Sequence, residues 1–319
     1  MGIVKLIKSP LNYTGNKYRI LSQIQQYFPS EIDCMVDLFC GGATVGLNVK
    51  AKKIIFIDNN PKVINLLVFL ARQKFETFLR ELEVLIEKYA LSYSYKYGYS
   101  KYRNLCSDKT DNNGLKDYNK DGFYKLRGDY NSLVDKTTDE ANTLLYLLMV
   151  YAFNNDIRFN SNGEFNLPIG KTDLNKMNVN KIKAYINRVN EINAEFVCMD
   201  FNNPKLSSII EKADFVYMDP PYLVGDAVYN TSWDNKTEYL LMDFLDELLK
   251  QKKNFALSNV MCKVGKVNEP LSYWCYKKQQ EIMVHDIDYN YKSASYNKIT
   301  RDAKEKEVLI VNRKYDEDK

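Results

Sequence analysis

Short apolar runs that end in turn-forming or acidic residues recur along the chain, and they predict strands. The runs MVDLF at 35–39, IIFI at 54–57 and FVY at 215–217 lead into a Gly-Gly turn, an Asp-Asn-Asn-Pro turn and an Asp-Pro-Pro-Tyr segment. Continuous apolar runs of this length suit strands that are covered on both faces of a sheet. Further strands are predicted at 195–200, 254–260, 280–287 and 307–312.

Apolar residues at helical spacing predict helices between these strands. Such spacing occurs at 62–72 and at 237–251, and the glycine turn after residue 39 is also expected to lead into a helix. Alternation of strand and helix at this spacing is the signature of parallel βαβ units. The predicted fold class is therefore α/β, with a doubly wound, Rossmann-like sheet.

An insertion interrupts this alternation. The stretch between Asp58 and Asp200 is several times longer than the roughly 30 residues that one α/β repeat needs. It contains helical patterns at 75–90 and 138–153, the latter with Thr138 or Asp139 as a cap, and a polar loop at 107–122. Alternation around Asn162-Gly163 predicts a β-hairpin. We expect 75–193 to form a mostly helical second domain, and 1–74 with 194–319 to form the first.

Composition excludes few classes of function. Lys plus Arg number 45 against 41 Asp plus Glu, and a net charge of +4 permits a polyanionic partner without requiring one. None of the six cysteines forms a Cys-x-x-Cys pair, so we expect no metal and a reducing compartment. No signal-peptide pattern or long apolar span occurs, which predicts a cytoplasmic protein without membrane contact. The only histidine, His285, is expected to be a strand residue.

The segment Asp219-Pro220-Pro221-Tyr222 carries candidate chemistry. The prolines force the chain to leave the sheet stiffly, so a carboxylate and a ring are fixed at the carboxyl end of a strand, where α/β sheets bind ligands. An Asp219 oxygen and the Pro220 carbonyl could accept both N–H bonds of an exocyclic amine and stabilise the charge that develops when it attacks a methyl group. Tyr222 could stack on a flipped base. The alternative is a plain proline turn.

A nucleoside site is predicted near the glycine turn DLFCGGATVG. This turn is neither a dinucleotide-binding fingerprint nor a phosphate-binding loop, and a simple turn is the alternative. Asp58 ends the next strand about 20 residues later, where an acidic residue can bind ribose hydroxyls. S-adenosylmethionine is a nucleoside ligand without a phosphate requirement, and it fits this pattern.

An ordered set of segments resembles the Dam-like class of N6-adenine DNA methyltransferases, and the resemblance spans nearly the whole chain. The segments are YTGNK at 13–17, DLFCGGA at 37–43, FIDNNP at 56–61, YKLRGDYN at 124–131, FNNDIRFNSNGEFNLPIGK at 153–171, MDF at 199–201 and DPPY at 219–222.

The resemblance implies roles for individual residues. The catalytic segment would be Asp219, Pro220, Pro221 and Tyr222. S-adenosylmethionine would be bound by Tyr13, Lys17, Asp37, Phe39, Gly41, Asp58, Asp200, Phe201 and Asp219. The hairpin 153–171 would be a target-recognition element that contacts DNA through Phe153, Asn154 and Arg158, and Arg158 is the leading candidate to recognise a guanine.

Two further stretches are candidates for DNA contact. The segment after the motif would place Tyr229 and Trp233 over a flipped base, with a loose surface loop as the alternative. Lys298, among tyrosines and other basic residues, could contact a phosphate or could simply be solvated.

The leading hypothesis is a methyltransferase that acts on adenine in double-stranded DNA, as a monomer or weak dimer, with S-adenosylhomocysteine as the second product. A cognate restriction endonuclease acting on the same site is compatible with it. Methylation of a cytosine amine is disfavoured because Asp opens the motif, and ribosomal RNA because a base-recognition hairpin suits duplex DNA. A DNA-binding regulator without catalysis is a further alternative.

Overall fold

The computed structural model describes residues 6–13, 15–107, 112–224, 233–263, 265–288 and 306–313. The chain divides into two compact units, which are described separately. The helical unit comprises Met1–Asn16 and Asn60–Glu191, and the sheet unit comprises Lys17–Asn59 and Ile192–Lys319.

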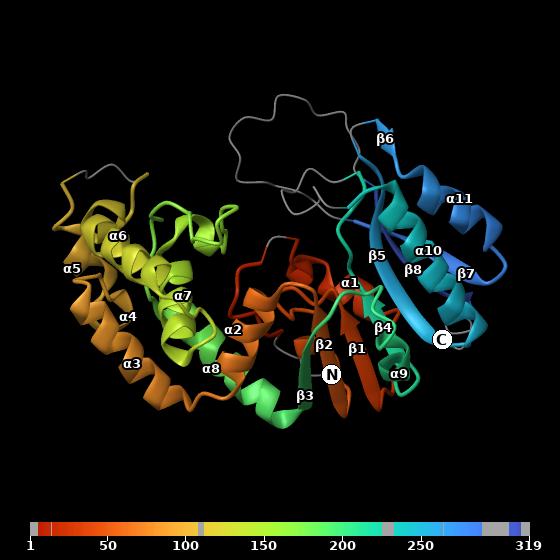
Figure 1. Cartoon of the computed structure of the whole chain (residues 1–319), viewed down its shortest axis with the longest axis horizontal. Coiled ribbons are helices and arrows are strands. Elements are labelled where there is room, and N and C mark those ends of the chain that lie inside the picture. Colours follow the sequence, from red (N-terminus) through yellow and green to blue (C-terminus); the bar gives the residue numbers. More distant parts are fainter. Residues whose placement is uncertain are drawn as a thin grey trace. The chain divides into compact units, whose positions relative to one another are not determined.

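A single sheet with the order β3-β2-β1-β4-β5-β8-β7 forms the centre of the sheet unit (Figure 1). Neighbours from β3 through β5 run parallel, whereas β8 is antiparallel to both β5 and β7, and the short β6 pairs with β5. The mixed α/β class with a mostly parallel sheet is thus confirmed. The strands are β1 (Cys34–Leu38), β2 (Lys53–Asp58), β3 (Asn193–Cys198), β4 (Phe215–Met218), β5 (Asn254–Lys263), β6 (Lys266–Val267), β7 (Ile282–Ile287) and β8 (Lys306–Asn312).

Helices cover one face of this sheet and form a core with it. The covering helices are α9 (Leu206–Ile210), α10 (Asn235–Lys250) and α11 (Glu269–Lys277), and buried side chains from β1, β2, β4, β5 and β8 pack against them. Asp234 caps α10 by accepting a hydrogen bond from the Thr237 amide at 2.8 Å. The unit also contains α1 (Leu21–Gln25) and the 3-10 helices η1 (Lys17–Arg19) and η2 (Gly46–Asn48).

Helices account for most of the other unit (Figure 1). They are α2 (Pro61–Ala71), α3 (Phe75–Lys88), α4 (Ser94–Tyr97), α5 (Tyr99–Arg103), α6 (Lys116–Ser132), α7 (Asp139–Tyr151), the 3-10 helix η3 (Phe153–Asn155) and α8 (Lys176–Glu191). All residues of α7 from Ala141 to Tyr151 are buried, so this helix is the centre of the unit.

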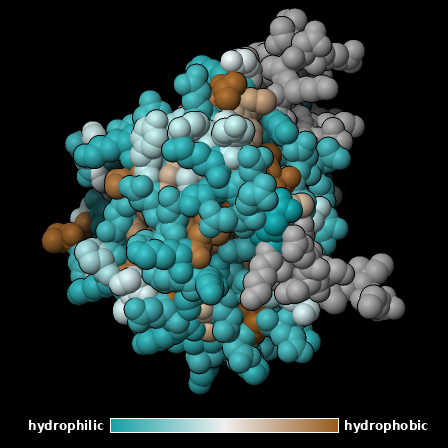
Figure 2. Space-filling model, turned by 90° about the vertical axis from the view of Figure 1, so that its right-hand side faces the viewer, coloured by the Kyte–Doolittle hydropathy of each residue, from teal (hydrophilic) through white to brown (hydrophobic). Residues whose placement is uncertain are grey.

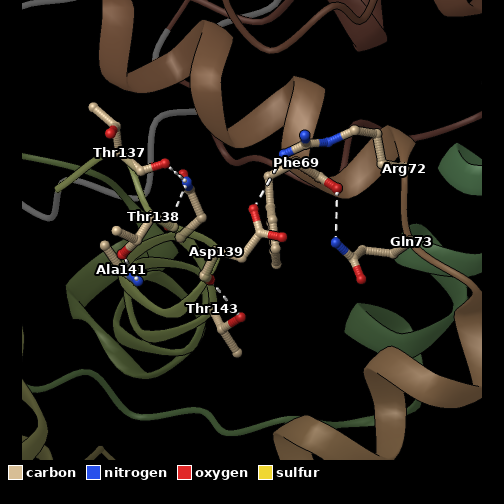
Figure 3. A network of polar contacts seen from close by, with 9 residues as sticks. Phe69, Arg72, Gln73, Thr137, Thr138, Asp139, Ala141 and Thr143 are labelled. Carbon is tan, nitrogen blue, oxygen red and sulfur yellow. Dashed lines mark hydrogen bonds and ion pairs between the residues drawn. The ribbon is translucent and has the colours of Figure 1, made fainter. Parts of the chain in front are cut away.

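Polar contacts between α2 and α7 help to explain why α2 belongs to the helical unit (Figure 3). Arg72, directly after α2, contacts Asp139 in the first turn of α7 at 3.1 Å. The Thr138 hydroxyl accepts a hydrogen bond from the Ala141 amide at 3.1 Å, which identifies Thr138 as the cap. The second segment of the helical unit therefore begins at Asn60, and the domain bounds that we expected stay a prediction.

Three local predictions differ from the structure. The turn after β1 leads only into the 3-10 helix η2, and not into an α-helix. The expected polar loop is helical from Lys116. Gly122 lets this helix pack closely against the backbone of Tyr89, because an added Cβ would lie only 2.0 Å from the Tyr89 carbonyl oxygen. Strand pairing in the predicted hairpin is limited to isolated bridges that join Ala152 with Ile169 and Phe159 with Phe165.

The face drawn in Figure 2 is mostly hydrophilic, and its hydrophobic residues are scattered instead of forming one large patch. No helix among the described segments is long and apolar enough to cross a membrane.

Candidate active site

The sheet order creates a switch point between β1 and β4. From β1 the chain adds β2 and then β3 on one side, whereas β4 and β5 extend the sheet on the other side. Ligands of open α/β sheets bind outside the carboxyl ends of the strands at such a point. The glycine turn after β1 and the Asp-Pro-Pro-Tyr segment after β4 both begin there, because Leu38 pairs with Met218.

Two buried carboxylates shape the loop that follows β1. One oxygen of Asp37 accepts a hydrogen bond from the Gly46 amide, and one oxygen of Asp58 accepts from the Gly41 amide, both at 2.9 Å. The loop bends sharply because Phe39 and Ala43 have φ of 63°, a conformation that is uncommon for residues with a side chain. Asp58 thus holds the loop backbone in addition to its expected role toward a ribose.

Asp37 has an unusual protonation equilibrium. Burial raises the pKa of its carboxyl to about 7, the hydrogen bond from Gly46 opposes the rise, and the charges of Asp219 and Asp58 add to it. Its protonation therefore changes near neutral pH.

Asp219 lies between a buried lysine and the last residue of its own motif. The Lys17 ammonium is 2.9 Å from Asp219 Oδ2, and the Tyr222 hydroxyl donates to Asp219 Oδ1 at 2.9 Å. Lys17 also lies 3.7 Å from Glu307 on β8 and 5.0 Å from the centre of the Tyr222 ring. Burial raises the pKa of Asp219. Lys17 opposes this rise through its charge and its hydrogen bond, and the Tyr222 hydroxyl opposes it through its hydrogen bond.

Aromatic rings from three segments meet near the same edge of the sheet. Phe39 follows β1, Phe201 follows β3, and Trp233 precedes α10; their ring centroids lie 5.3–5.8 Å apart. Asp200, beside Phe201, accepts hydrogen bonds from the Asn59 side chain at 3.3 Å and from the Asn202 amide at 2.9 Å. The structure thus brings Trp233, which we predicted to contact DNA, against two residues predicted to bind the cofactor.

The predicted recognition residues belong to the helical unit. Phe153 is 48% exposed, and it precedes Asn154 and Asn155, which both have positive φ. Asn155 is held by the Val150 carbonyl and, at 2.9 Å, by the Thr172 hydroxyl. Consecutive residues in this strained conformation persist only where the surroundings fix them, and such strain is often found at functional sites.

Arg158 is exposed and is already ordered by a neighbour. Its Nε donates to the Asn166 side chain at 2.8 Å, and the Asn166 amide donates to the Arg158 carbonyl at 3.1 Å. Tyr13 also belongs to the helical unit, whereas Lys17 belongs to the sheet unit. Tyr229 and Lys298 lie outside the described residues.

Several residues of this site could not be found from motifs. Glu307 reaches Lys17 only because β8 pairs beside β5, and Ser258 on β5 lies 2.8 Å from the Tyr217 hydroxyl next to the Asp219 motif. The only sequence signal for Glu307 is an acidic residue at the start of the apolar run EVLIVN. The mixed α/β class, the mostly parallel sheet and the segment at its switch point are consistent with a methyltransferase fold.

Comparison with known proteins gives the family. A family model for D12 class N6 adenine-specific DNA methyltransferases matches residues 13–287, and the chain belongs to this family. Membership implies S-adenosylmethionine as the methyl donor and confirms the resemblance to Dam-like enzymes.

Named relatives agree with this assignment. The chain is 36% identical over 314 residues to the type II methyltransferase M.FokI of Planomicrobium okeanokoites and 34% identical over 317 residues to the modification methylase StsI of Streptococcus sanguinis. These alignments cover 96% and 97% of this chain but 43% of each relative, so the chain spans less than half their length. It is 24% identical over 212 residues to a DNA adenine methylase of Haemophilus influenzae, with 66% of this chain and 63% of that protein covered.

Proposed function

We propose that this chain transfers a methyl group from S-adenosylmethionine to the N6 amine of an adenine in double-stranded DNA. The observation that carries the proposal is the position of Asp219 at the carboxyl end of β4, beside the switch point, where Lys17 and Tyr222 orient its two oxygens. The sheet unit would bind the cofactor and carry out the chemistry. The helical unit would recognise the target sequence through Phe153, Asn154 and Arg158.

The donor set fits a nucleoside cofactor. Asp58 and Asp200 supply carboxylates for hydroxyl and amine groups, and Phe39 with Phe201 supplies aromatic surface for a purine. Buried Asp37 and the Gly41 turn lie in the same loop, where the methionine portion would be held. Bound S-adenosylmethionine supplies an electrophilic methyl group on a sulfonium.

Asp219 would act on the attacking amine. Each carboxylate oxygen has two lone pairs, so Asp219 can keep its bonds to Lys17 and Tyr222 and still accept an N–H bond of the adenine amine. This bond strengthens as positive charge develops on the nitrogen, which lowers the barrier. The Pro220 carbonyl would accept the second N–H bond, and Pro221 would stiffen the segment.

Access to the amine would require that the adenine leaves the duplex, and Tyr222 would then stack on the base. The Tyr222 hydroxyl fixes the ring through its hydrogen bond to Asp219. The aromatic Phe153 on its strained turn supports a DNA contact in the helical unit. Because relatives are named modification methylases, a restriction partner is included in the proposal, with monomer or weak dimer as the oligomeric state.

The test measures both activity and product. Purified protein is incubated with plasmid DNA and methyl-labelled S-adenosylmethionine, and the nucleosides are separated by mass after digestion. We expect N6-methyladenine, and we expect Asp219→Asn to reduce its formation by at least about 100-fold without loss of cofactor binding. Asp33→Asn, near the amino end of β1, is the matched control and should retain activity. N4-methylcytosine as the labelled nucleoside, or an active Asp219→Asn protein, would contradict the proposal.

A further inference from the structure

The side chain of Trp233 is held by a buried carboxylate. Its indole Nε1 donates to Glu238 Oε2, in the first turn of α10, and Glu238 is fully buried. The other oxygen, Glu238 Oε1, accepts a hydrogen bond from the Asn268 side-chain amide at 2.7 Å. A single carboxylate thus connects Trp233, two residues before α10, with Asn268, which caps α11.

Asn268 cannot reverse its amide to suit a different partner. Its Oδ1 accepts from the Leu271 amide at 3.2 Å as the cap of α11, and its backbone N–H donates to the Met261 carbonyl at 2.8 Å. Its Nδ2 must therefore face Glu238. Because the indole of Trp233 is also only a donor, the two donors face two separate oxygens of one side chain, and only a carboxylate carries two acceptor oxygens and no donor.

Burying this carboxylate has a cost, which suggests that its position matters. Burial raises the pKa of Glu238, and the hydrogen bonds from Asn268 and Trp233 oppose the rise. An apolar side chain would avoid that cost but would leave the indole N–H without its acceptor. What the carboxylate determines is the orientation of the ring, which packs against Phe39 at 5.8 Å and Phe201 at 5.6 Å.

We propose that Trp233 forms, with Phe39 and Phe201, the aromatic wall against which the adenine of S-adenosylmethionine packs, and that Glu238 is the positioning residue for the Trp233 indole. This inference rests on the proposed function, because it names part of the cofactor site of the same enzyme. It assigns Trp233 to the cofactor and not to the flipped base. Rings held in a fixed orientation favour ligand binding because little side-chain freedom is lost when the ligand binds.

The first experiment uses the fluorescence of Trp233. The chain has two tryptophans, and Trp274 lies on α11 with its Nε1 bonded to Asp246 at 2.9 Å. In a Trp274→Phe protein, S-adenosylhomocysteine should change the emission of Trp233 saturably and protect it from acrylamide. The midpoint should equal the dissociation constant from calorimetry. An emission that stays constant while calorimetry reports binding overturns the inference.

The second experiment tests Glu238 through a double-mutant cycle. In Glu238→Gln the new NH2 group faces either the Trp233 indole or the Asn268 amide, and both of these are also donors. One hydrogen bond is therefore lost, and the dissociation constant of S-adenosylhomocysteine should rise about three- to ten-fold. Trp233→Phe removes the indole N–H, and adding Glu238→Gln to it should change the constant by less than about two-fold. KM for S-adenosylmethionine should rise with kcat nearly unchanged, because a wall binds ground state and transition state alike.

Asp246→Asn is the matched control, because it perturbs the other tryptophan–carboxylate pair of α10 and should leave cofactor affinity within about two-fold. If Glu238→Gln has the same effect in the wild-type chain and in the Trp233→Phe protein, the positioning role is overturned. If Glu238→Gln does not fold, the fluorescence titration still decides whether Trp233 faces the cofactor. Failure of the wild-type chain to bind S-adenosylhomocysteine would refute the proposed function itself, whereas binding with a silent Trp233 refutes only this inference.

Discussion

Replacing Lys17 by Met should reveal how far the buried ammonium opposes the rise in the pKa of Asp219 that burial causes. At 2.9 Å, the attraction between Lys17 and Asp219 is about 6 kcal/mol at an effective dielectric constant of 20, before the cost of removing both charges from water. Removing one partner of a buried pair usually costs about 3–5 kcal/mol. The Asp219 side chain retains 19% exposure, so we expect the lower end of that range.

A loss of about 3 kcal/mol corresponds to a melting temperature roughly 6–12 °C lower for a unit of this size. The sign of the pH dependence follows from Asp219, whose pKa is raised in the folded protein even with Lys17 present. Without Lys17 the pKa rises further, so the ionised form is penalised more. The stability difference between Lys17→Met and wild type should therefore grow as pH rises above the pKa of Asp219 and shrink as pH falls below it.

The assay combines thermal unfolding with the pH profile of kcat/KM for DNA. Because the ionised carboxylate of Asp219 is the stronger acceptor and stabilises the positive charge on the attacking amine, the acid limb of the Lys17→Met profile should move to higher pH. Lys52→Met is the matched control: it breaks the exposed pair with Asp33 and should leave both measurements nearly unchanged. An acid limb at the wild-type position, or a stability loss that does not depend on pH, would refute the reasoning.

Three further predictions concern the loop, the recognition element and the buried acid. Gly46→Ala would place a Cβ 2.4 Å from the Phe56 ring and should lower the free energy of unfolding by about 1–3 kcal/mol in a denaturant titration. Gly128→Ala, with open space around its Cβ, should instead raise it by about 0.5–1 kcal/mol, and equal effects would contradict the packing argument. Arg158→Ala should relax selection at one base position at a cost of about 1–3 kcal/mol, measured as methylation rates on single-base variants of the target at one salt concentration; a uniform loss would show that Arg158 only positions the duplex. Because the pKa of Asp37 is raised to about 7, stability should fall as pH rises from about 4 toward 7, and Asp37→Asn should flatten that part of the stability curve.

The sequence by itself determined the elements of the sheet and the chemistry at one of its ends. Apolar runs located the strands because burial on both faces requires continuous apolar side chains, and β4 ends where Asp219-Pro220 begins. Thr138 was identified as a possible cap because its hydroxyl satisfies an amide within the same turn. Such features depend on neighbours in the sequence, so a single sequence contains them.

Only the tertiary structure decided which distant residues act together. Lys17 meets both Asp219 and Glu307 because the order of the strands brings segments that are far apart in the sequence to one edge of the sheet. Trp233 was assigned to DNA from its place after the motif, and only the packing of three separate segments brings it against Phe39. Periodicity gives the element and the face on which a side chain lies, whereas the partner across the fold depends on strand register and helix packing, which involve the whole chain at once.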